Sequence, residues 1–588
     1  MCGIGGYMTS EGEPPETVLQ SLITSLKHRG PDGTGRYSTP GLGLVQTRLA
    51  IIDLKTGDQP IYGPGGTALI ANAEIYNYVE LRRELSPAKF TTQSDCEMPL
   101  FTYARDGRAF AASLRGMHAI ALHDPNVPVL YLSRDRFGIK PLYYAETAKG
   151  FLFASEPEAL LKTGLVKREI RKDVATELLQ LQFTAGRATI FAGIERALPG
   201  ETLEVKAGRI AGRRILPALP KGPPREMSED EALKQLDTVL MDSVAVHQRS
   251  DVPYGMFLSG GIDSSALLAC MARLNTRPVR AFTAGFPGSK ARDERAHAHR
   301  VAKTLGAEHI EISVSENDFW THMPAIAAAM DDPAADYAIL PTYLLGKEAA
   351  KGVKVVLSGE GGDELFAGYG RYRAALRPRL LGGRAMRARG FLDGLGILRE
   401  ASHWRDGIAA AEQAVRRHGW TKLQQAQAAD CAEWLPNDLL IKLDRCLMAH
   451  GLEGRTPFLD SIVADFAFNL PDRLKLARGQ GKYLLRRWLS SALPEADAFS
   501  KKRGFTVPVA EWIRGKARDL APMVSATEGI KEICKGDAVR RLFEEYERGG
   551  GKRQGAACWQ LLFYALWHRV HGEGRTSAGD VFATLDAR

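Results

Sequence analysis

The spacing of hydrophobic and polar residues changes along the chain and divides it into two regions. Up to about residue 210, short apolar runs alternate with turn residues, a pattern typical of strands. The expected strands are 42–53, 68–76, 118–124 and 129–133. One helix is expected where apolar residues recur at helical spacing from Val18 to Leu26, before Gly30 and Pro31 stop it. A second helix is expected near residues 78–85.

A proline-rich segment, residues 217–227, separates this region from the second, and we place the whole linker at 211–228. Ser228 is expected to start a helix through a capping box with Glu231. Strands then alternate with helical stretches, which favours a parallel α/β sheet. The expected strands are 252–258, 280–286, 309–313 and 353–357. The predicted domains are therefore 1–210 and 229–572; the chain beyond about 400 is expected to be mainly helical, and 573–588 a loose tail.

Composition is ordinary for a globular protein. The chain has 588 residues, 45% of them hydrophobic and 25% charged, which is too long for a single core. No apolar run reaches membrane-spanning length, and no secretory signal pattern is visible. The seven cysteines are few and scattered, so we expect reduced thiols in a cytoplasmic protein.

The formal net charge of +9 is compatible with a nucleic-acid partner or with an acidic small molecule such as ATP. One segment is rich in arginine. Its members are Arg371, Arg373, Arg377, Arg379, Arg384, Arg387 and Arg389. Only Tyr369 and Tyr372 lie among them, too few for a platform that stacks single-stranded bases. We interpret the segment as a solvated surface and expect neither a nucleic-acid nor a membrane partner.

Cys2 is the first candidate for chemistry. If Met1 is removed, Cys2 carries both a thiol and a free α-amine. The amine has an ordinary pKa of about 7.7–8.0, so it can act as a base for the thiol without a separate histidine. The hexapeptide Met1-Cys2-Gly3-Ile4-Gly5-Gly6 therefore indicates an N-terminal nucleophile, although an accidental cysteine at this position explains the hexapeptide alone equally well.

Two glycine-rich loops follow predicted strands in the second region. Residues 259–265, Ser-Gly-Gly-Ile-Asp-Ser-Ser, precede a helix and can cradle a phosphate group, with Asp263 available for Mg²⁺. The loop lacks Gly-Lys-Ser/Thr, so it is not a P-loop that transfers a γ-phosphoryl group. Residues 358–364, Ser-Gly-Glu-Gly-Gly-Asp-Glu, add Asp363 as a second metal ligand and Glu360 for proton handling.

Four other residues are weaker candidates. His297 and His299 have neither helix-face nor common zinc spacing, so they are expected to be surface or packing residues. Asp331 and Asp332 precede Pro333 and are expected to end a helix rather than to catalyse.

Together these motifs resemble the glutamine-hydrolysing asparagine synthetases, from Cys2 to about Trp567. The matching segments of the first region are 2–4, 28–32, 48–53, 72–77, 94–95 and 134–144. Those of the second region are 259–265, 358–364, 452–460, 481–486 and 501–505. The resemblance implies an N-terminal-nucleophile αββα sandwich with class II glutamine amidotransferase activity. It also implies a PP-loop ATP pyrophosphatase domain with a parallel sheet.

For the first domain, the resemblance implies that Cys2 attacks the glutamine amide, forms a thioester and releases ammonia. The Asn72 side chain and the Ala73 backbone N–H would stabilise the oxyanion. Arg48 would pair with the glutamine carboxylate, and Asp95 would hold its α-ammonium group. The remaining expected glutamine contacts are Ile52 and Glu74.

For the second domain, the resemblance implies that ATP and Mg²⁺ adenylate a carboxylate with loss of pyrophosphate. The expected nucleotide contacts are Phe257, Leu258, Ser259, Gly261, Asp263, Ser264, Ala284, Ser358 and Gly359. Asp263 and Asp363 would hold the metal, Glu360 would serve the acyl-adenylate, and Lys482 would stabilise charge in the transition state. Ammonia would pass internally between the sites, and a homodimer is expected from the resemblance only.

Two residues depart from the family pattern. Ala73 stands where the family usually has glycine; it keeps the N–H but is strained if the position needs positive φ. Pro157 stands where an aliphatic residue or lysine is usual, and only local effects are expected.

Several functions remain open at this stage. The acceptor is aspartate or another carboxylate, such as a peptide, a cell-wall component or a sugar acid. Ring closure with an internal amine, as in β-lactam synthetases, is disfavoured because those relatives lack the nucleophile. An RNA-modifying PP-loop enzyme leaves the first 210 residues unexplained, and a nonenzymatic binding role leaves both sets of polar residues without a purpose.

Overall fold

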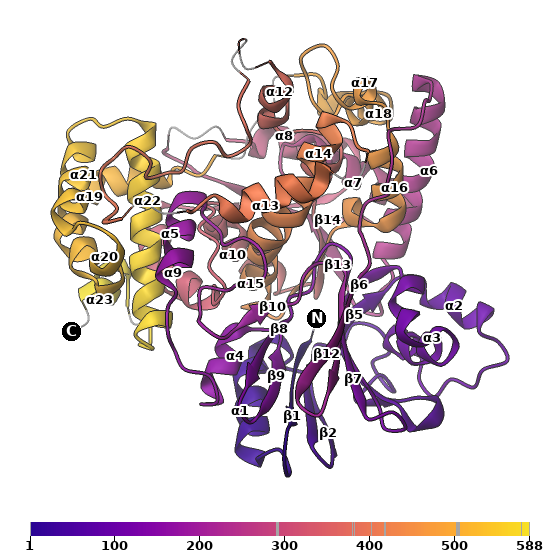
Figure 1. The fold of residues 1–588 in the computed structure, drawn as a ribbon. Coiled ribbons are helices and arrows are strands. Elements are labelled where there is room, and N and C mark those ends of the chain that lie inside the picture. The colour runs from indigo at the N-terminus through magenta and orange to yellow at the C-terminus, as the bar shows by residue number, and fades with distance from the viewer. Residues whose placement is uncertain are drawn as a thin grey trace.

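Two antiparallel sheets form the N-terminal part of the computed structural model, which describes residues 2–289, 293–378, 380, 383–400, 403–416, 419–500, 506–577 and 579–586 (Figure 1). The first sheet has the strand order β10-β8-β9-β1-β3-β2. Its strands are β1 (Gly3–Thr9), β2 (Gly33–Thr39), β3 (Leu42–Arg48), β8 (Tyr143–Thr147), β9 (Gly150–Ala154) and β10 (Glu195–Arg196). The second has the order β12-β11-β7-β6-β5-β4. Its strands are β4 (Ile61–Tyr62), β5 (Ala68–Ile75), β6 (Gly116–Asp124), β7 (Val129–Arg134), β11 (Glu201–Lys206) and β12 (Arg209–Ile215).

These sheets are the two middle layers of a four-layer sandwich. Apolar side chains of alternate strand positions, such as Ile4 and Leu44 of the first sheet and Ile70 and Leu132 of the second, fill one core between them. The helices α1 (Glu16–Leu26) and α4 (Pro157–Lys162) pack on the outer face of the first sheet. The helices α2 (Tyr78–Glu84) and α3 (Met98–Asp106) pack on the outer face of the second sheet. The predicted αββα fold is confirmed.

A five-stranded sheet with the order β15-β14-β13-β16-β17, parallel throughout, forms the centre of the second part (Figure 1). Its strands are β13 (Tyr254–Phe257), β14 (Arg280–Gly285), β15 (Glu308–Ser313), β16 (Val355–Leu357) and β17 (Glu453–Arg455). The helices in and before this region are α5 (Lys172–Leu181), α6 (Glu229–His247), α7 (Ile262–Leu274), α8 (Arg295–Thr304), α9 (Glu316–Ala329) and α10 (Ile339–Ala349). Separate apolar clusters cover its two faces, as expected for a parallel sheet buried on both sides.

Helices dominate the rest of the chain, as predicted. They are α11 (Gly362–Leu365), α12 (Gly370–Leu376), α13 (Asp406–Val415), α14 (Lys422–Ala429), α15 (Ile441–Met448), α16 (Ser461–Asn469), α17 (Asp472–Lys475), α18 (Tyr483–Ala492), α19 (Val509–Ala526), α20 (Glu528–Ile533), α21 (Gly536–Glu547), α22 (Lys552–Trp567) and α23 (Val581–Asp586). The expected loose tail is wrong for α23, because Val581 and Leu585 are buried in the apolar cluster that contains Trp320.

Most predicted elements are present, with shifted ends. Strand β3 stops at Arg48 rather than at residue 53, and β12 extends to Ile215, inside the predicted linker. Ser228 caps α6, since its hydroxyl accepts a hydrogen bond from Glu231 N at 3.3 Å. The Glu231 carboxylate instead accepts from Gln235 Nε2 at 3.2 Å, so the reciprocal half of the predicted capping box is wrong.

Buried ion pairs join the two parts of the chain. Arg29 is fully buried and donates to both carboxylate oxygens of Asp444 at 2.8 Å. Helix α9 ends at Ala329, close to the predicted position, but Asp331 and Asp332 also have partners across the interface. Asp331 accepts from Glu158 N of the first part at 3.0 Å, and Asp332 accepts from Arg196 Nε at 2.7 Å and from the Tyr143 hydroxyl at 2.6 Å.

Two further expectations concern the whole chain. All seven cysteines are free thiols, as predicted. Among the described residues, no helix combines the length and the apolar composition needed to span a bilayer.

Candidate active sites

Cys2 lies where the two stacked sheets meet. It directly precedes β1, it is 8% exposed, and its backbone N–H donates to Asn72 Oδ1 on β5 at 2.9 Å. Burial raises the pKa of the Cys2 thiol, while the Leu49 backbone and the Arg48 guanidinium act in the opposite direction. The thiol therefore needs a base to become a nucleophile, in line with the role expected for an N-terminal amine.

The Asn72 side chain and the Ala73 backbone were expected to provide the two donors of an oxyanion hole. Asn72 is fully buried, and its Nδ2 has no hydrogen-bond partner among the described residues. Ile75 N, two positions beyond Ala73, donates to Asp95 Oδ2 at 2.7 Å on the side of β5 away from β6. Because alternate residues of a strand direct their N–H groups to the same edge, the Ala73 N–H points to that edge too.

Ala73 itself is not strained. It lies inside β5 and is not among the residues with positive φ. Its carbonyl accepts from Cys96 Sγ at 3.7 Å, in agreement with the direction of its N–H. Alanine was expected to be strained here only if the position needed positive φ; the backbone does not need it, so no glycine is required.

Two of the predicted glutamine contacts lie near these residues, Arg48 close to the Cys2 thiol and Asp95 beside β5. Arg48 Nη1 contacts the exposed carboxylate of Asp58 at 2.7 Å, and Nη2 donates to the carbonyls of Asp53 at 2.5 Å and Ile52 at 3.5 Å. Since Asp58 is solvated, an incoming carboxylate can replace it at little cost. Asp95 is buried, and this burial raises its pKa to about 6.

Glu74 has a different partner from the one expected. Its carboxylate forms a buried ion pair with Arg455 Nη2 of β17 at 2.7 Å, so its side chain joins the glutaminase strand to the parallel sheet. Burial raises the pKa of Glu74, and Arg455 opposes the rise. Arg455 also donates to Glu453 at 2.7 Å, and it is fully buried.

The first glycine-rich loop connects β13 to the N-terminus of α7. Gly261 is the N-cap residue of this helix, and Ser264 stabilises the loop: its hydroxyl donates to Ser259 O at 2.9 Å and accepts from Ser259 N at 3.1 Å. Gly260 N donates to Glu294 Oε2 at 3.2 Å, so one loop amide already binds an anionic oxygen. This arrangement is typical of a phosphate-binding turn.

The second loop brings Asp363 beside Asp263. Lys482 Nζ lies between them, 2.8 Å from Asp363 and in closer contact with Asp263. Burial alone would lower the pKa of Lys482, but the two carboxylates raise it above its ordinary value. Glycine is needed around this cluster, since a Cβ on Gly362 would lie 2.5 Å from Asp263 Oδ1 and one on Gly368 1.8 Å from Asp363 Oδ1.

A cavity of about 330 Å³ opens beside both loops. The predicted nucleotide residues that line it are Phe257, Leu258, Ser259, Asp263, Ser264, Ala284, Ser358 and Gly359. Glu360 and Asp363 line it as well, and the Ser358 hydroxyl donates to the Glu360 carboxylate. Gly261 and Lys482 are not lining residues, but the contacts above place both at its edge.

Sequence reasoning missed the far wall of this cavity, where Asp336 and Lys442 lie. Lys442 Nζ is 2.9 Å from Asp336 Oδ2. Burial alone would lower the pKa of Lys442, but Asp336 raises it above its ordinary value, so the cavity contains a fixed cation. Neither residue belongs to a short motif; only the folding of α15 against the sheet brings them here.

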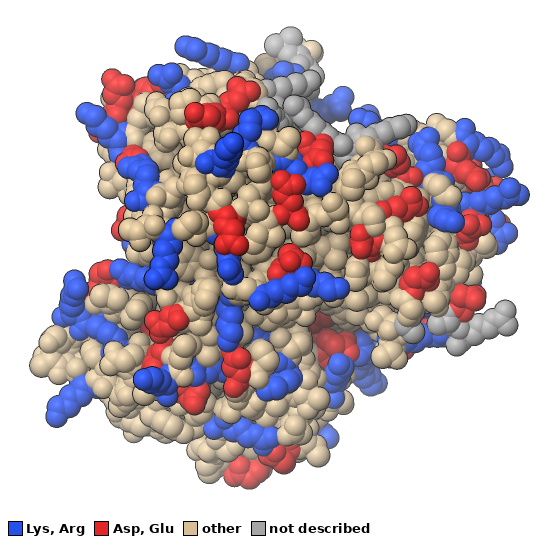
Figure 2. Space-filling model, turned by 180° about the vertical axis from the view of Figure 1, so that it is seen from behind, with Lys and Arg blue, Asp and Glu red and all other residues tan. Residues whose placement is uncertain are grey.

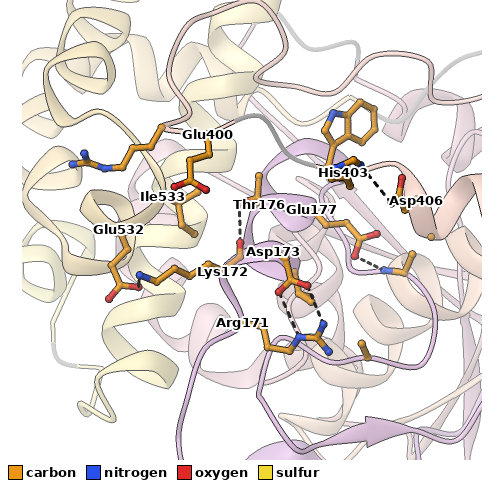
Figure 3. Close-up of a pocket in the computed structure, with 16 residues that line it drawn as sticks. Arg171, Lys172, Asp173, Thr176, Glu177, Glu400, His403, Asp406, Glu532 and Ile533 are labelled. Atoms are coloured by element: carbon orange, nitrogen blue, oxygen red, sulfur yellow. Dashed lines mark hydrogen bonds and ion pairs between the residues drawn. The ribbon is translucent and has the colours of Figure 1, made fainter.

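A larger cavity, of about 620 Å³, lies elsewhere and contains none of the predicted site residues (Figure 3). Its charged groups largely neutralise one another: Arg171 binds Asp173 at 2.9 Å, and Lys172 lies 3.9 Å from Glu532. We therefore place the chemistry at the smaller cavity, where two glycine loops and a shared cation converge.

The arginine-rich segment is only partly solvated. Arg373, Arg377, Arg384 and Arg389 are exposed, as expected. The expectation is wrong for Arg371, which lies 2.6 Å from Asp430 and 3.6 Å from the Tyr369 ring centre, and for Arg387, which covers Trp434. On the face drawn in Figure 2, basic and acidic residues are interspersed. Arg379, the matching segment 501–505 and Met1 lie outside the described residues.

Comparison with known proteins decides the family. The family model described as Asparagine synthase matches residues 235–569, more than half of the chain. The chain belongs to the asparagine synthase family. A second model, Glutamine amidotransferase domain, matches residues 1–215. This member of the asparagine synthase family therefore combines a glutaminase-type sandwich with a synthetase-type sheet.

Curated relatives match over nearly the full length. Asparagine synthetase [glutamine-hydrolyzing] 1 of Bacillus subtilis is 32% identical and covers 98% of each chain. A putative asparagine synthetase [glutamine-hydrolyzing] of Mycobacterium tuberculosis is 34% identical over 97% of this chain and 98% of its own. The amidase chyE of Penicillium rubens is 26% identical over 94% of this chain and 96% of its own. Relatives of this family thus have more than one assigned activity.

Proposed function

We propose that this enzyme amidates aspartate to asparagine, using glutamine as the nitrogen source and cleaving ATP to AMP and pyrophosphate. The observation that carries the proposal is the presence, on one chain, of two separate sites. Cys2 N binds Asn72 Oδ1, while Asn72 Nδ2 is buried and has no hydrogen-bond partner among the described residues, and two glycine loops converge on a nucleotide-sized cavity. We assign the first site to residues 1–210 and the second to 229–572, joined by residues 211–228.

In the first site, Cys2 attacks the amide carbon of glutamine after Met1 has been removed. Its α-amine takes the thiol proton, and the leaving ammonia receives a proton in turn. Asn72 Nδ2 and the Ala73 N–H stabilise the oxyanion: Cys2 N is bonded to Oδ1 of the same Asn72 amide, and Nδ2 has no partner among the described residues. Arg48 and Asp95 bind the two charged ends of the amino-acid moiety. Water then hydrolyses the thioester to glutamate.

In the second site, the loop amides before α7 bind the pyrophosphate end of ATP, and Glu360 assists at the acyl-adenylate. Asp263 and Asp363 fit Mg²⁺, because both already contact the single cationic group of Lys482. The ion would supply charge neutralisation at the phosphate oxygens. Lys482 adds a fixed positive charge on the same side.

The test uses glutamine labelled with ¹⁵N at its amide, together with Mg-ATP and aspartate. Mass spectrometry is expected to detect labelled asparagine and an equal amount of AMP. Cys2→Ala is expected to abolish this reaction but to spare synthesis from free ammonia, because only the first site uses the thiol. Equal loss of both activities would contradict the division into two sites.

A second candidate is the same chemistry on another carboxylate. The similarity to a protein named as an amidase favours keeping it, and no short motif fixes the acceptor pocket. Labelled ammonia and glutamate without asparagine or AMP would point to this candidate. A panel of peptide, cell-wall and sugar acids then identifies the acceptor through AMP formation.

A further inference from the structure

Three side chains with metal-binding atoms meet at the free edge of the parallel sheet. His309 and Glu311 alternate along the edge strand β15, so they face the same side, and His299 of α8 lies over them. His309 Nδ1 is 3.4 Å from His299 Nδ1 and 3.3 Å from Glu311 Oε1. The third distance, from His299 Nδ1 to Glu311 Oε1, is 3.8 Å.

These distances are those of ligands around one ion. A circle through the three atoms has a radius of about 2.0 Å, which equals the usual length of Zn–N and Zn–O bonds. His299 is 60% exposed, so an ion can enter from solvent and keep a water molecule as its fourth ligand. We propose that His299, His309 and Glu311 form a site for a divalent transition-metal ion such as Zn²⁺.

The hydrogen bonds of His309 support this proposal independently. The Thr283 hydroxyl donates its only proton to Leu258 O at 2.6 Å, because a carbonyl cannot donate. It must therefore accept from His309 Nε2 at 2.8 Å, so the Nε2 atom carries the proton. With the proton on Nε2, the Nδ1 atom of the neutral ring is unprotonated. Its Nδ1 thus directs a lone pair toward a carboxylate oxygen, an arrangement that a shared cation stabilises.

The ligand set selects the kind of ion. Two imidazoles and one carboxylate suit zinc, cobalt, nickel or copper, whereas Mg²⁺ prefers oxygen ligands. The Thr283 contact is the outer-shell hydrogen bond that usually orients a metal-bound histidine. Thr283 and Leu258 also line the nucleotide cavity, so the site lies directly behind its wall and is separate from the Asp263–Asp363 pair. His299 is a surface residue and His297 a packing residue, as predicted; the proposal adds a ligand role to His299.

The test is titration of the full-length protein, freed of metal, with Zn²⁺ and with Co²⁺. We expect one equivalent to bind, the midpoint of thermal unfolding to rise, and Co²⁺ to develop visible bands of nitrogen and oxygen coordination. His299→Asn and Glu311→Gln are expected to weaken binding by at least about 10- to 100-fold. His403→Asn is the matched control, because that histidine is also exposed but lies outside the cluster.

Millimolar Mg²⁺ is not expected to displace the bound ion. Equal affinity of the wild type, His299→Asn and Glu311→Gln would overturn the proposal. So would sulfur-to-cobalt charge-transfer bands, because they would place the metal on cysteines. Both readouts are independent of glutamine or ATP turnover, so they test the metal site whatever the acceptor acid is.

Discussion

Removal of the Asn72 amide tests the oxyanion hole most directly. Asn72→Ala deletes the one donor in this site that is fully buried and has no partner among the described residues. A donor in such a dry position is already freed from water, so it stabilises developing negative charge without reorganisation. The Ala73 N–H remains in the variant, and half of the hole is therefore retained.

Loss of one such donor costs about 2.7–4 kcal/mol of transition-state stabilisation, which is roughly 10²- to 10³-fold in kcat. We expect this loss in glutamate release at saturating glutamine. AMP formation with free ammonia is expected to stay near the wild-type rate, because it does not use the hole. The matched control is Ala73→Gly. The backbone at this position is extended, so glycine relieves no strain and keeps the N–H, and the rate of glutamine hydrolysis should stay near that of the wild type.

Two results would refute this reasoning. If Asn72→Ala kept more than about a tenth of the wild-type kcat, the amide would not be a donor to the oxyanion. If Ala73→Gly raised the rate of glutamine hydrolysis by a large factor, the alanine would be strained in a way that its extended backbone does not allow. A change confined to KM would also count against the assignment, because a transition-state contact changes kcat.

Three other predictions concern charge. Burial raises the pKa of Asp95 to about 6, and only the ionised carboxylate binds an ammonium group. The kcat/KM for glutamine should therefore fall about tenfold per pH unit below pH 6. A flat pH profile down to pH 5 would contradict this. Asp263→Asn should stop AMP formation but spare glutaminase activity; normal AMP production would remove Asp263 from the metal site. Arg455→Met leaves the Glu74 carboxylate buried without its ion-pair partner, so the free energy of unfolding should fall by about 3–5 kcal/mol. The midpoint of thermal unfolding should fall accordingly, and the double variant that adds Glu74→Gln should recover part of the loss.

Local patterns predicted the elements and the motifs because both depend on neighbours in the sequence. The apolar stripe from Val18 to Leu26 forms α1, and the strand before Ser259 ends where the predicted glycine-rich loop begins. The end of β3 at Arg48 was harder to predict, because the residues beyond it are apolar for another reason: Ile51 and Ile52 pack against the second domain. Apolar runs alone do not separate a strand from an interdomain contact.

Long-range ion pairs could not be predicted in the same way. Arg29, Glu453 and Arg455 were all within recognised motifs, but a motif gives residue types, not partners. The arginine-rich segment shows the same limit, because the burial of Arg371 depends on Asp430, far along the chain. A charged residue is expected in solvent by default. Only the folded chain shows which charged residues are buried, with the cost of desolvation offset by an ion-pair partner.

The pairing of Glu74 with Arg455 connects the two proposed sites. Glu74 follows Asn72 and Ala73, the proposed oxyanion donors, on β5, and its carboxylate binds Arg455 Nη2 at 2.7 Å. The Arg455 carbonyl accepts from Ser358 N at 2.8 Å, and the Ser358 hydroxyl donates to Glu360 in the nucleotide cavity. Three hydrogen bonds, connected through the covalent structure of Arg455 and Ser358, thus link the two proposed centres. A buried ion pair is weak evidence for added stability, but breaking it by removing one partner is costly; we therefore argue that this one keeps β5 in a single arrangement against the parallel sheet.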